Sequence, residues 1–555
     1  MKKILLFTLL FFGVCNAQAG KRNIGEMKQV ARSVIRSINR STTRSTLANA
    51  PLDVLHEASQ FTIIGGKQGF AIIANDDKFE AVLGYSETAY DSNNVAPGFR
   101  WWMKAMNDQL AYNLEHGISM TSETPANQGF AQSVDALIKT KWGQGAPYND
   151  QTPTYTSGSG KDKQEVHYVT GCVATAMAQI MYYHKWPEKG KGYVSYYFTP
   201  EGSDASQKLS ANLAQAPYKW DDMLLNYSTT SYTEEQAKAV STLMMHCGYG
   251  VMMQYTKDGS GAYTHDAVDA MRKRFYYHNN MHFYWRDFFP IDEWMKIIYS
   301  ELNEGCPILY GGRSKSGGHE FILDGYDETG KIHVNWGWNG SQDGYFDIAS
   351  LNGYNNGQEM ALIRKNDAEV AYHSCWGIDG SLTTNISVQT NLKVNFQAYN
   401  FDYNSFVGEI AVVLQDLKTN KIEVLSKSVI SEPVEYLNGK GFEFTGINIT
   451  GMTDGDYRLY AASMATDKEN EWQPIRCIET SNNSYLVNIS AGKVKITGEN
   501  NPNWTAGTTA IQSITNQNDF IKNQTIYDLR GHQVGTNPDA LPKGIYIING
   551  KKVVK

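Results

Sequence analysis

The chain has 555 residues, of which 41% are hydrophobic and 19% are charged, as is usual for folded globular proteins. One hydrophobic core does not serve a chain of this length, so we expect three or four domains. A formal net charge of −7 gives no electrostatic reason to expect a nucleic-acid partner.

The first 19 residues have the pattern of an export signal. "MKK" forms a positive start, "ILLFTLLFFGV" an apolar stretch, and "CNAQAG" offers small residues for cleavage after Ala19. The apolar stretch is short for a membrane span, and no later segment is apolar enough to cross a bilayer. We therefore expect a secreted or cell-surface protein without a transmembrane segment.

Residues 20–132 are expected to form an α+β N-terminal unit. The segment "QFTIIGGKQGFAIIAND" predicts two strands joined by a glycine turn, and "FRWWMKAMNDQLAYNLEHG" predicts an amphipathic helix ending near Gly117. A polar linker follows over residues 121–133, and proteases prefer to cut such exposed stretches. From these patterns alone, the unit could also be a small domain without a regulatory role.

Residues 133–367 are expected to form a central unit with an α+β fold. Helices come early, around Cys172 and from Glu234 to Gly248. The strands "PILYGG", "HEFILDGYD", "KIHVNWGW" and "GYFDIASL" follow, separated by glycine-rich turns. Helices first and an antiparallel sheet second is an α+β arrangement.

The last third of the chain is expected to be rich in β-structure. Residues 368–495 alternate polar and apolar positions, and "DGDYRLY" is typical of the tyrosine corner of an immunoglobulin-like sandwich. Any other β-sandwich would fit the alternation equally well. Residues 496–555 predict a polar linker and a small tail of short strands.

Six cysteines are present, and removal of Cys15 with the signal leaves five. An odd number in an exported protein indicates a free thiol, although parity does not say which one. The spacings suit neither a zinc site nor a dense disulfide framework. We therefore expect no metal and no cofactor, and the pairing stays open. The other five are Cys172, Cys247, Cys306, Cys375 and Cys477.

Cys172 opens the predicted helix "CVATAMAQIMYYHKW", which ends before Pro187. An isolated cysteine is most often a small buried hydrophobic residue. A helix N-terminus nevertheless favours a thiolate, because its free N–H groups and positive dipole end stabilise negative charge.

His319 is the strongest candidate for a base. It opens an apolar strand directly after "SKSGG", where glycines let the backbone and a ligand approach closely. It lies 147 residues after Cys172 (172 to 319), within the roughly 130–150 that separate these residues in papain-like proteases. Many histidines would meet that spacing by chance.

Three further side chains could complete a catalytic set. Asn335 can accept a hydrogen bond from an imidazole and fix its tautomer, and Trp336 can exclude water from that contact. Core packing at a turn would explain "NWGW" as well. Gln144, with the backbone N–H of Cys172, could bind an oxyanion, although a lone glutamine is usually a surface residue.

Together, "KWGQGAPYN", "GCVATAMAQIMYYHKWP", "GGHEFILDGYD" and "HVNWGWNG" resemble the streptopain family of secreted bacterial cysteine peptidases. The resemblance implies a papain-like fold with Cys172 as nucleophile and His319 as general base and acid. It implies Gln144 as oxyanion donor and Asn335 with Trp336 as the orienting group. The local cysteine signature of papain itself is absent.

The segment "KDGSGAYTHDAV" is similar to the family's substrate-cleft loop. It makes Ser260, Gly261 and Ala262 candidate substrate contacts, and Gly318 and Trp338 complete the predicted set. The resemblance implies broad specificity for protein and peptide substrates, with an apolar preference two positions before the cleaved bond.

The segment "GGKQGFAIIANDDKFEAVLGYSE" resembles the family's inhibitory propeptide. The chain would then be a zymogen, inhibited by its own residues 20–132 and cut in the linker on activation. The tail "LPKGIYIINGKKVVK" is similar to the C-terminal sorting domain of the Bacteroidetes type IX secretion route. It implies export machinery as a partner and passage through the outer membrane.

Two alternatives remain open at this point. The chain could be a surface adhesin with an inactive peptidase domain, although all the catalytic side chains are present. It could also be a transglutaminase-like acyl transferase using Cys172 and His319. Such enzymes more usually have an acidic third member, and product analysis with an added amine would separate the two activities.

Overall fold

The computed structural model describes the greater part of the chain. The expected export signal, most of the linker between the first two units, and Cys15 and Cys375 lie outside the described residues. The described residues are 20–38, 51–120, 129–200, 203–257, 259–279, 281–289, 291–314, 317–351, 357–365, 376–385, 391–466, 472–477, 483–499 and four short strands between 526 and 554.

The N-terminal unit is a helix on a four-stranded meander, followed by a long helix. Met27, Ala31 and Ile35 recur every four residues along α1 and are buried against β2 and β3. The predicted hairpin and the predicted helix are both confirmed. The elements are α1 (Ile24–Ile38), β1 (Asp53–Glu57), β2 (Phe61–Gly66), β3 (Gly69–Ala74), β4 (Val82–Ser86) and α3 (Pro97–Glu115).

The central unit has its helices before its main sheet, as predicted. A capping box starts α5: Gln236 N donates to Thr233 Oγ1 at 3.3 Å, and Thr233 N donates to Gln236 Oε1 at 2.9 Å. The helices are α4 (Cys172–His184), α5 (Glu234–Gly250), α6 (Thr264–Arg274) and α7 (Ile291–Asn303). The strands are β5 (Thr154–Ser157), β6 (Gln164–His167), β7 (Tyr193–Phe198), β8 (Gln207–Asn212), β9 (His282–Trp285), β10 (Ile308–Ser314), β11 (Gly317–Tyr326), β12 (Ile332–Asn335), β13 (Gly344–Phe346) and β14 (Glu359–Leu362).

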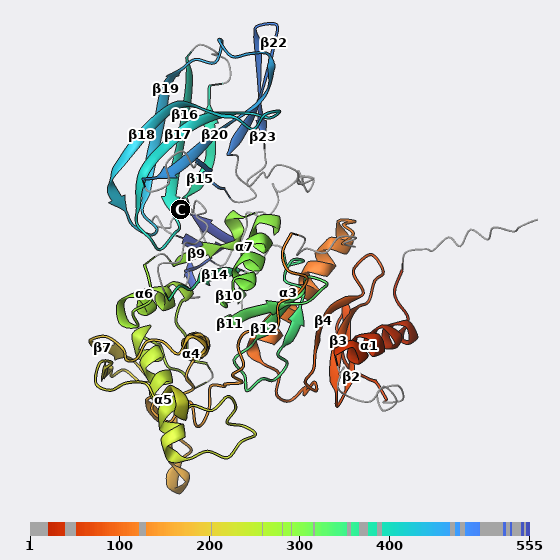
Figure 1. The fold of residues 1–555 in the computed structure, drawn as a ribbon, viewed down its shortest axis with the longest axis vertical. Coiled ribbons are helices and arrows are strands. Elements are labelled where there is room, and N and C mark those ends of the chain that lie inside the picture. The colour runs from red at the N-terminus through yellow and green to blue at the C-terminus, as the bar shows by residue number, and fades with distance from the viewer. Residues whose placement is uncertain are drawn as a thin grey trace, which may run out of the picture.

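The two units share one ten-stranded sheet, in the order β1-β2-β3-β4-β13-β12-β11-β10-β14-β9. The junction is the antiparallel pair β4–β13, in which Tyr85 lies opposite Tyr345 and Gly84 opposite Phe346. One hydrophobic core runs through both units. Figure 1 shows the N-terminal unit, in red and orange, beside the green strands of the central unit.

The third unit is a β-sandwich, shown in cyan and blue at the top of Figure 1. Its smaller sheet has the order β15-β16-β19, and its larger sheet has the order β18-β17-β20-β22-β23, with β21 paired to β20. The predicted tyrosine corner is present, because Tyr457 donates to the Thr453 carbonyl at 2.9 Å. The strands are β15 (Trp376–Thr384), β16 (Leu392–Asn400), β17 (Phe406–Asp416), β18 (Ile422–Val434), β19 (Gly439–Ile447), β20 (Gly455–Ala465), β21 (Gln473–Pro474), β22 (Ser484–Ser490) and β23 (Lys493–Glu499).

The sandwich packs directly against the central unit. Phe288 stacks on Phe401 with ring centroids 4.4 Å apart. Arg476 makes two hydrogen bonds to the Glu293 carboxylate, at 2.5 and 2.9 Å, from a side chain that is only 4% exposed. A buried bidentate pair and an aromatic stack are contacts that hold two domains in one orientation.

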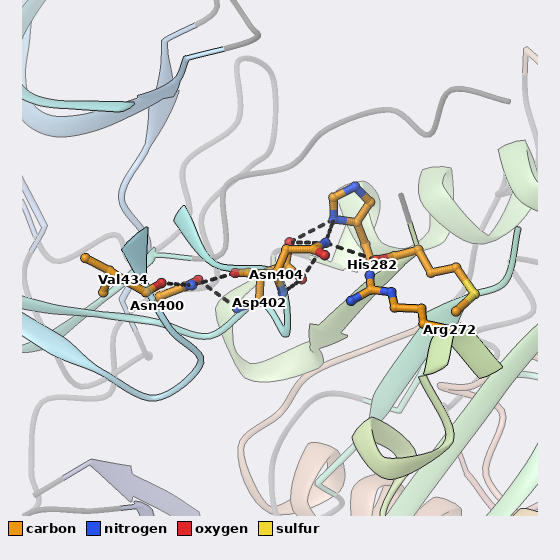
Figure 2. Close-up of polar contacts among 7 residues, drawn as sticks. Arg272, His282, Asn400, Asp402, Asn404 and Val434 are labelled. Atoms are coloured by element: carbon orange, nitrogen blue, oxygen red, sulfur yellow. Dashed lines mark hydrogen bonds and ion pairs between the residues drawn. The ribbon is translucent and has the colours of Figure 1, made fainter. Parts of the chain in front are cut away.

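A polar contact lies at the edge of this interface (Figure 2). Asp402 Oδ2 accepts from His282 Nδ1 at 2.8 Å, and Asn404 Nδ2 donates to the Met281 carbonyl at 3.0 Å. Asn400 holds the loop from behind, because its amide donates to the Asn404 and Val434 carbonyls. The loop after β16 is therefore shaped to meet β9.

The last strands of the chain complete the fold. Strand β23 runs to Glu499, so the sandwich extends past its expected end at residue 495. The tail forms a separate sheet of order β25-β24-β26-β27. Among the described residues, no helix has the length and apolar character to cross a membrane. The tail strands are β24 (Ile526–Asp528), β25 (Gln533–Gly535), β26 (Ile545–Ile548) and β27 (Lys551–Val554).

Candidate active site

Cys172 is the first residue of α4, at the end that carries the free N–H groups. The preceding Gly171 has φ of +89°, a conformation that L side chains rarely adopt. A Cβ at Gly171 would lie 2.8 Å from the Ser260 carbonyl oxygen, so only glycine fits this close approach. The half-buried thiol is thus placed at a helix start with a neighbouring loop against it.

Strand β11 passes beside this thiol and presents different residues on its two faces. His319 lies opposite Gly312, and Glu320 lies opposite Gly311. Burial raises the pKa of the Cys172 thiol to about 11, partly opposed by hydrogen bonding to the backbone of Glu320. The thiol therefore lies next to Glu320 and is held protonated at neutral pH.

His319 is covered by α3 of the N-terminal unit. Burial, with a smaller effect of the nearby Arg100 guanidinium, lowers the pKa of His319 to about 4. On the same face, a Cβ at Gly312 would collide with the Trp101 indole. Among the hydrogen bonds and ion pairs of the described residues, none joins Cys172 to His319. A thiolate–imidazolium pair is therefore not formed in this state.

Gln144 is held close to the start of α4. Its carbonyl accepts from the Thr170 N–H at 3.1 Å, two residues before the thiol. The residue is buried. The Gln144 backbone is thus tied to the segment just before Cys172, and the role of its side chain as oxyanion donor stays a prediction.

Asn335 has a different partner from the one expected. Its Oδ1 accepts from Gln179 Nε2 at 3.0 Å and from the Gly337 N–H at 3.0 Å, and its Nδ2 donates to the Thr140 carbonyl at 2.9 Å. In this state it therefore orients Gln179 and not His319, which faces α3. Gln179 was missed in the sequence, although it lies two helical turns after Cys172 on α4.

Both tryptophans of the "NWGW" segment touch the N-terminal unit. The Trp336 indole is buried and donates to the Gln342 carbonyl at 2.9 Å. A Cβ at Gly98 of α3 would lie 2.7 Å from this indole. Trp338 Nε1 donates to Asn94 Oδ1 at 2.8 Å. Trp336, predicted to help orient the base, and Trp338, predicted to contact substrate, are thus both in contact with the N-terminal unit, just before α3 or at its start.

The predicted substrate loop lies against the segment that leads to Cys172. Ser260 is buried, and its hydroxyl donates to the Val169 carbonyl at 2.7 Å. Gly261 pairs through its backbone with Gln254, and Ala262 is half-buried. Gly318 is exposed at the start of β11. The loop is therefore anchored to the segment that leads into α4.

In the part of the chain that the structure describes, no group of His, Cys, Asp and Glu side chains has the arrangement of a metal site. Cys172, Cys247 and Cys306 form no disulfide.

One group near the thiol was not predicted at all. Thr264, Glu320, Glu359 and Arg313 form a buried polar cluster on the face of β10 and β11 that lies away from α3. A charged residue inside the apolar strand "HEFILDG" was the available signal.

Comparisons with known proteins agree with this geometry. Residues 142–346 match the model of the Peptidase C10 family, and residues 24–110 match the model described as Spi protease inhibitor. Streptopain of Streptococcus pyogenes is 31% identical over 288 residues, which cover 51% of this chain and 72% of that protein. The chain belongs to the peptidase C10 family.

Further relatives of this C10 chain include a longer protein and a solved structure. Thiol protease/hemagglutinin PrtT of Porphyromonas gingivalis is 30% identical over 394 residues, covering 65% of this chain. The match spans 44% of PrtT, less than half its length. The structure of a fragment of Prevotella intermedia prointerpain A is 34% identical with a TM-score of 0.51 and covers 58% of this chain and 99% of that one.

Proposed function

We propose that this C10 chain is the zymogen of a secreted cysteine endopeptidase with broad specificity. Cys172 is the nucleophile and His319 is the general base and acid. The proposal is carried by one observation: a thiol at the N-terminus of α4 lies beside the strand that carries His319, in a chain of this family. The N-terminal unit inhibits the enzyme, in agreement with the match of residues 24–110.

The proposed reaction forms and breaks an acyl-enzyme. After activation, His319 takes the thiol proton and the Cys172 thiolate attacks the scissile carbonyl. Gln144 and the Cys172 N–H donate to the oxyanion, each contributing about 3 kcal/mol. His319 then gives its proton to the leaving amine, and afterwards activates the water that releases the acyl group.

Activation requires a movement of His319. Its ring now lies near Arg100 of α3, and removal of the N-terminal unit frees it to reach the thiol. Asn335 lies near the thiol helix through Gln179 and can accept from the ring once His319 has turned. The imidazolium that forms would lower the pKa of Cys172 from its present raised value.

The remaining roles follow the sequence. Ser260, Gly261, Ala262, Gly318 and Trp338 contact the peptide substrate. The segment 1–19 directs export, and the sheet β24–β27 is the sorting signal read by outer-membrane export machinery. The four-stranded tail sheet, separate from the sandwich, supports an autonomous C-terminal module.

The test compares wild type with Cys172→Ala on casein under reducing conditions, with gel analysis of the protein itself. We expect wild type to lose its N-terminal unit and degrade casein, and the variant to stay intact and inactive. Cys306→Ala, the same change at a half-buried cysteine of the central unit that forms no disulfide, is the control and keeps activity. If wild type stays inactive after another protease has cut the linker, the proposal is wrong.

A further inference from the structure

The buried polar cluster lies between the thiol and the candidate substrate loop. Thr264 begins α6, two residues after Ala262, and its hydroxyl lies 2.8 Å from Glu320 Oε2 and 2.8 Å from Glu359 Oε1. Glu320 follows His319 on β11, and its backbone contacts the Cys172 thiol. A group bound here would lie next to the reacting sulfur.

The cluster has room for its carboxyl groups because a glycine faces them. A Cβ at Gly311 would lie 2.8 Å from Glu320 Oε2 and 3.0 Å from Thr264 Oγ1. Any other residue at this position of β10 would displace the Glu320 carboxyl. The absence of a side chain at Gly311 therefore makes room for the Glu320 carboxyl group.

One oxygen of the cluster is left without a partner. Arg313 donates to Glu359 Oε1 from Nε at 3.0 Å and from Nη2 at 2.7 Å. Glu320 is 5% exposed, and its Oε1 has no hydrogen bond within the described part of the chain. If both carboxyl groups were ionised, the single Arg313 guanidinium would leave the cluster one positive charge short.

The missing cation explains the state of Glu320. Burial and the nearby Glu359 hold the pKa of Glu320 well above its usual range. Burial therefore favours the neutral form of Glu320, and a positive group beside it would favour the ionised form. A buried carboxylate is stabilised by a charge-assisted hydrogen bond and is costly when unpaired.

The cluster also reaches the surface. The Arg313 side chain is 23% exposed and lies over the Tyr263 ring at 5.1 Å from its centroid. Tyr263 directly follows the candidate substrate loop. An extended peptide bound along that loop can therefore place a side chain towards Glu320.

We propose that Glu320, Thr264 and Glu359 form a subsite that selects a basic side chain, arginine or lysine, of the bound peptide near the scissile bond. The inference rests on the proposed peptidase function and revises the apolar preference implied by the family. An ammonium or guanidinium group pairs with Glu320 Oε1 and restores the charge balance. A neutral side chain leaves that oxygen unpaired, and sites with unpaired buried polar groups discriminate strongly.

The test uses activated enzyme, freed of its N-terminal unit, and pairs of peptides that carry arginine or the neutral isostere citrulline. The exchange is made at each of the three positions before the cleaved bond. We expect the arginine peptide to have a kcat/KM at least about tenfold higher at one position, as a difference of about 1.4 kcal/mol gives. Glu320→Gln brings that ratio close to one. Glu304→Gln, a carboxyl-to-amide change at an exposed residue, leaves the ratio as in wild type.

A binding measurement separates this inference from the proposed function. The same peptides are titrated calorimetrically into the Cys172→Ala chain, cut in its linker and freed of the N-terminal unit. Tighter binding of the arginine peptide supports the subsite even if no peptide is hydrolysed. Hydrolysis by the wild type with equal rates for arginine and citrulline overturns the subsite and leaves the peptidase function standing. Equal affinities, or a preference that persists in Glu320→Gln, also overturn it.

Discussion

The Cys172 thiol lies in a site that keeps it protonated in the zymogen. Burial raises its pKa to about 11 and lowers that of His319 to about 4, so at neutral pH both groups are uncharged. The helix N-terminus favours the thiolate by only about 0.3–2 kcal/mol. Desolvation outweighs that effect here, so the thiol stays in its protonated, less reactive form.

This state predicts how the thiol reacts with iodoacetamide. A thiol whose pKa is raised gains thiolate only as the pH approaches that value, so its alkylation rate should rise about tenfold per pH unit between pH 7 and 10. The measurement follows the Cys172 peptide by mass spectrometry in intact His319→Ala zymogen, which does not process itself.

After removal of the N-terminal unit from wild type, the rate at pH 7 should rise at least about tenfold, because the imidazolium then stabilises the thiolate. Cys247, which is fully buried, serves as an internal control and should stay unmodified in both forms. A rate that levels off below pH 9 in the zymogen would contradict the protonated resting state.

Helix α3 is the element of the N-terminal unit that covers the candidate active site. Its first two turns place Gly98 on the Trp336 indole, Arg100 near His319 and Trp101 on the backbone of Gly312. One helix therefore covers the base, the tryptophan beside Asn335 and the strand opposite the base. None of these contacts involves the thiol itself, so the proposed inhibition would act through β10, β11 and the segment after β12.

Enlarging the closest contact should weaken this helix. In Gly98→Val the new side chain meets an indole 2.7 Å from its Cβ, and overpacking costs about 1–3 kcal/mol. The equilibrium constant for docking of α3 should fall by roughly five- to 160-fold, and the rate of self-processing should rise. Lys104→Ala, on the exposed side of α3, should process at the wild-type rate. Equal rates for the two variants would show that α3 does not hold the zymogen closed.

The elements were largely predictable, because each depends on local patterns. The helix at Cys172 and the hairpin β2–β3 follow from periodicity and glycine turns. The shared sheet was not predictable, since the β4–β13 pair joins residues about 260 apart (85 to 345) with no local signal. For the same reason the Asn335–Gln179 pair and the Glu320 cluster were missed. Recurring motifs identify candidate site residues, but they do not show which partners those residues contact in the zymogen.

At the scale of the whole molecule, the sandwich is coupled to the substrate side of the site. A stack runs from Arg313 over Tyr263, which stacks on His265 at 5.1 Å. His265 in turn stacks on Tyr403 of the sandwich at 6.0 Å, and Arg272 lies over that ring. The sandwich therefore helps to position the residues that follow the substrate loop, and we expect it to stay attached to the enzyme.

The docking of the sandwich should depend on Asp402. The change Asp402→Ala removes the acceptor of His282 at a nearly buried contact and should cost about 1–3 kcal/mol. Calorimetry of the Cys172→Ala zymogen should show a transition lowered by about 2–4 °C for each kcal/mol lost. Glu443→Ala breaks an exposed ion pair with Lys393. It should lower the free energy of unfolding by less than about 1 kcal/mol and shift the transition temperature correspondingly less. Identical transitions in the two variants would argue against a specific interface.

The pairing of β4 with β13 has a consequence for the timing of activation. A cut in the linker removes none of the contacts that hold the two units together here. These contacts are the backbone pairs at Tyr85 and Gly84, a 2.9 Å hydrogen bond from the Asp347 N–H to the Leu83 carbonyl, and a hydrogen bond from the Trp102 indole to the Asp347 carbonyl. After the cut, the proposed inhibitor is a separate chain that is still bound, and the fraction that stays bound then depends on concentration. At the high concentration of a secretory compartment, cut molecules would stay inactive. Dilution into the surroundings, with no further chemistry, would release their activity.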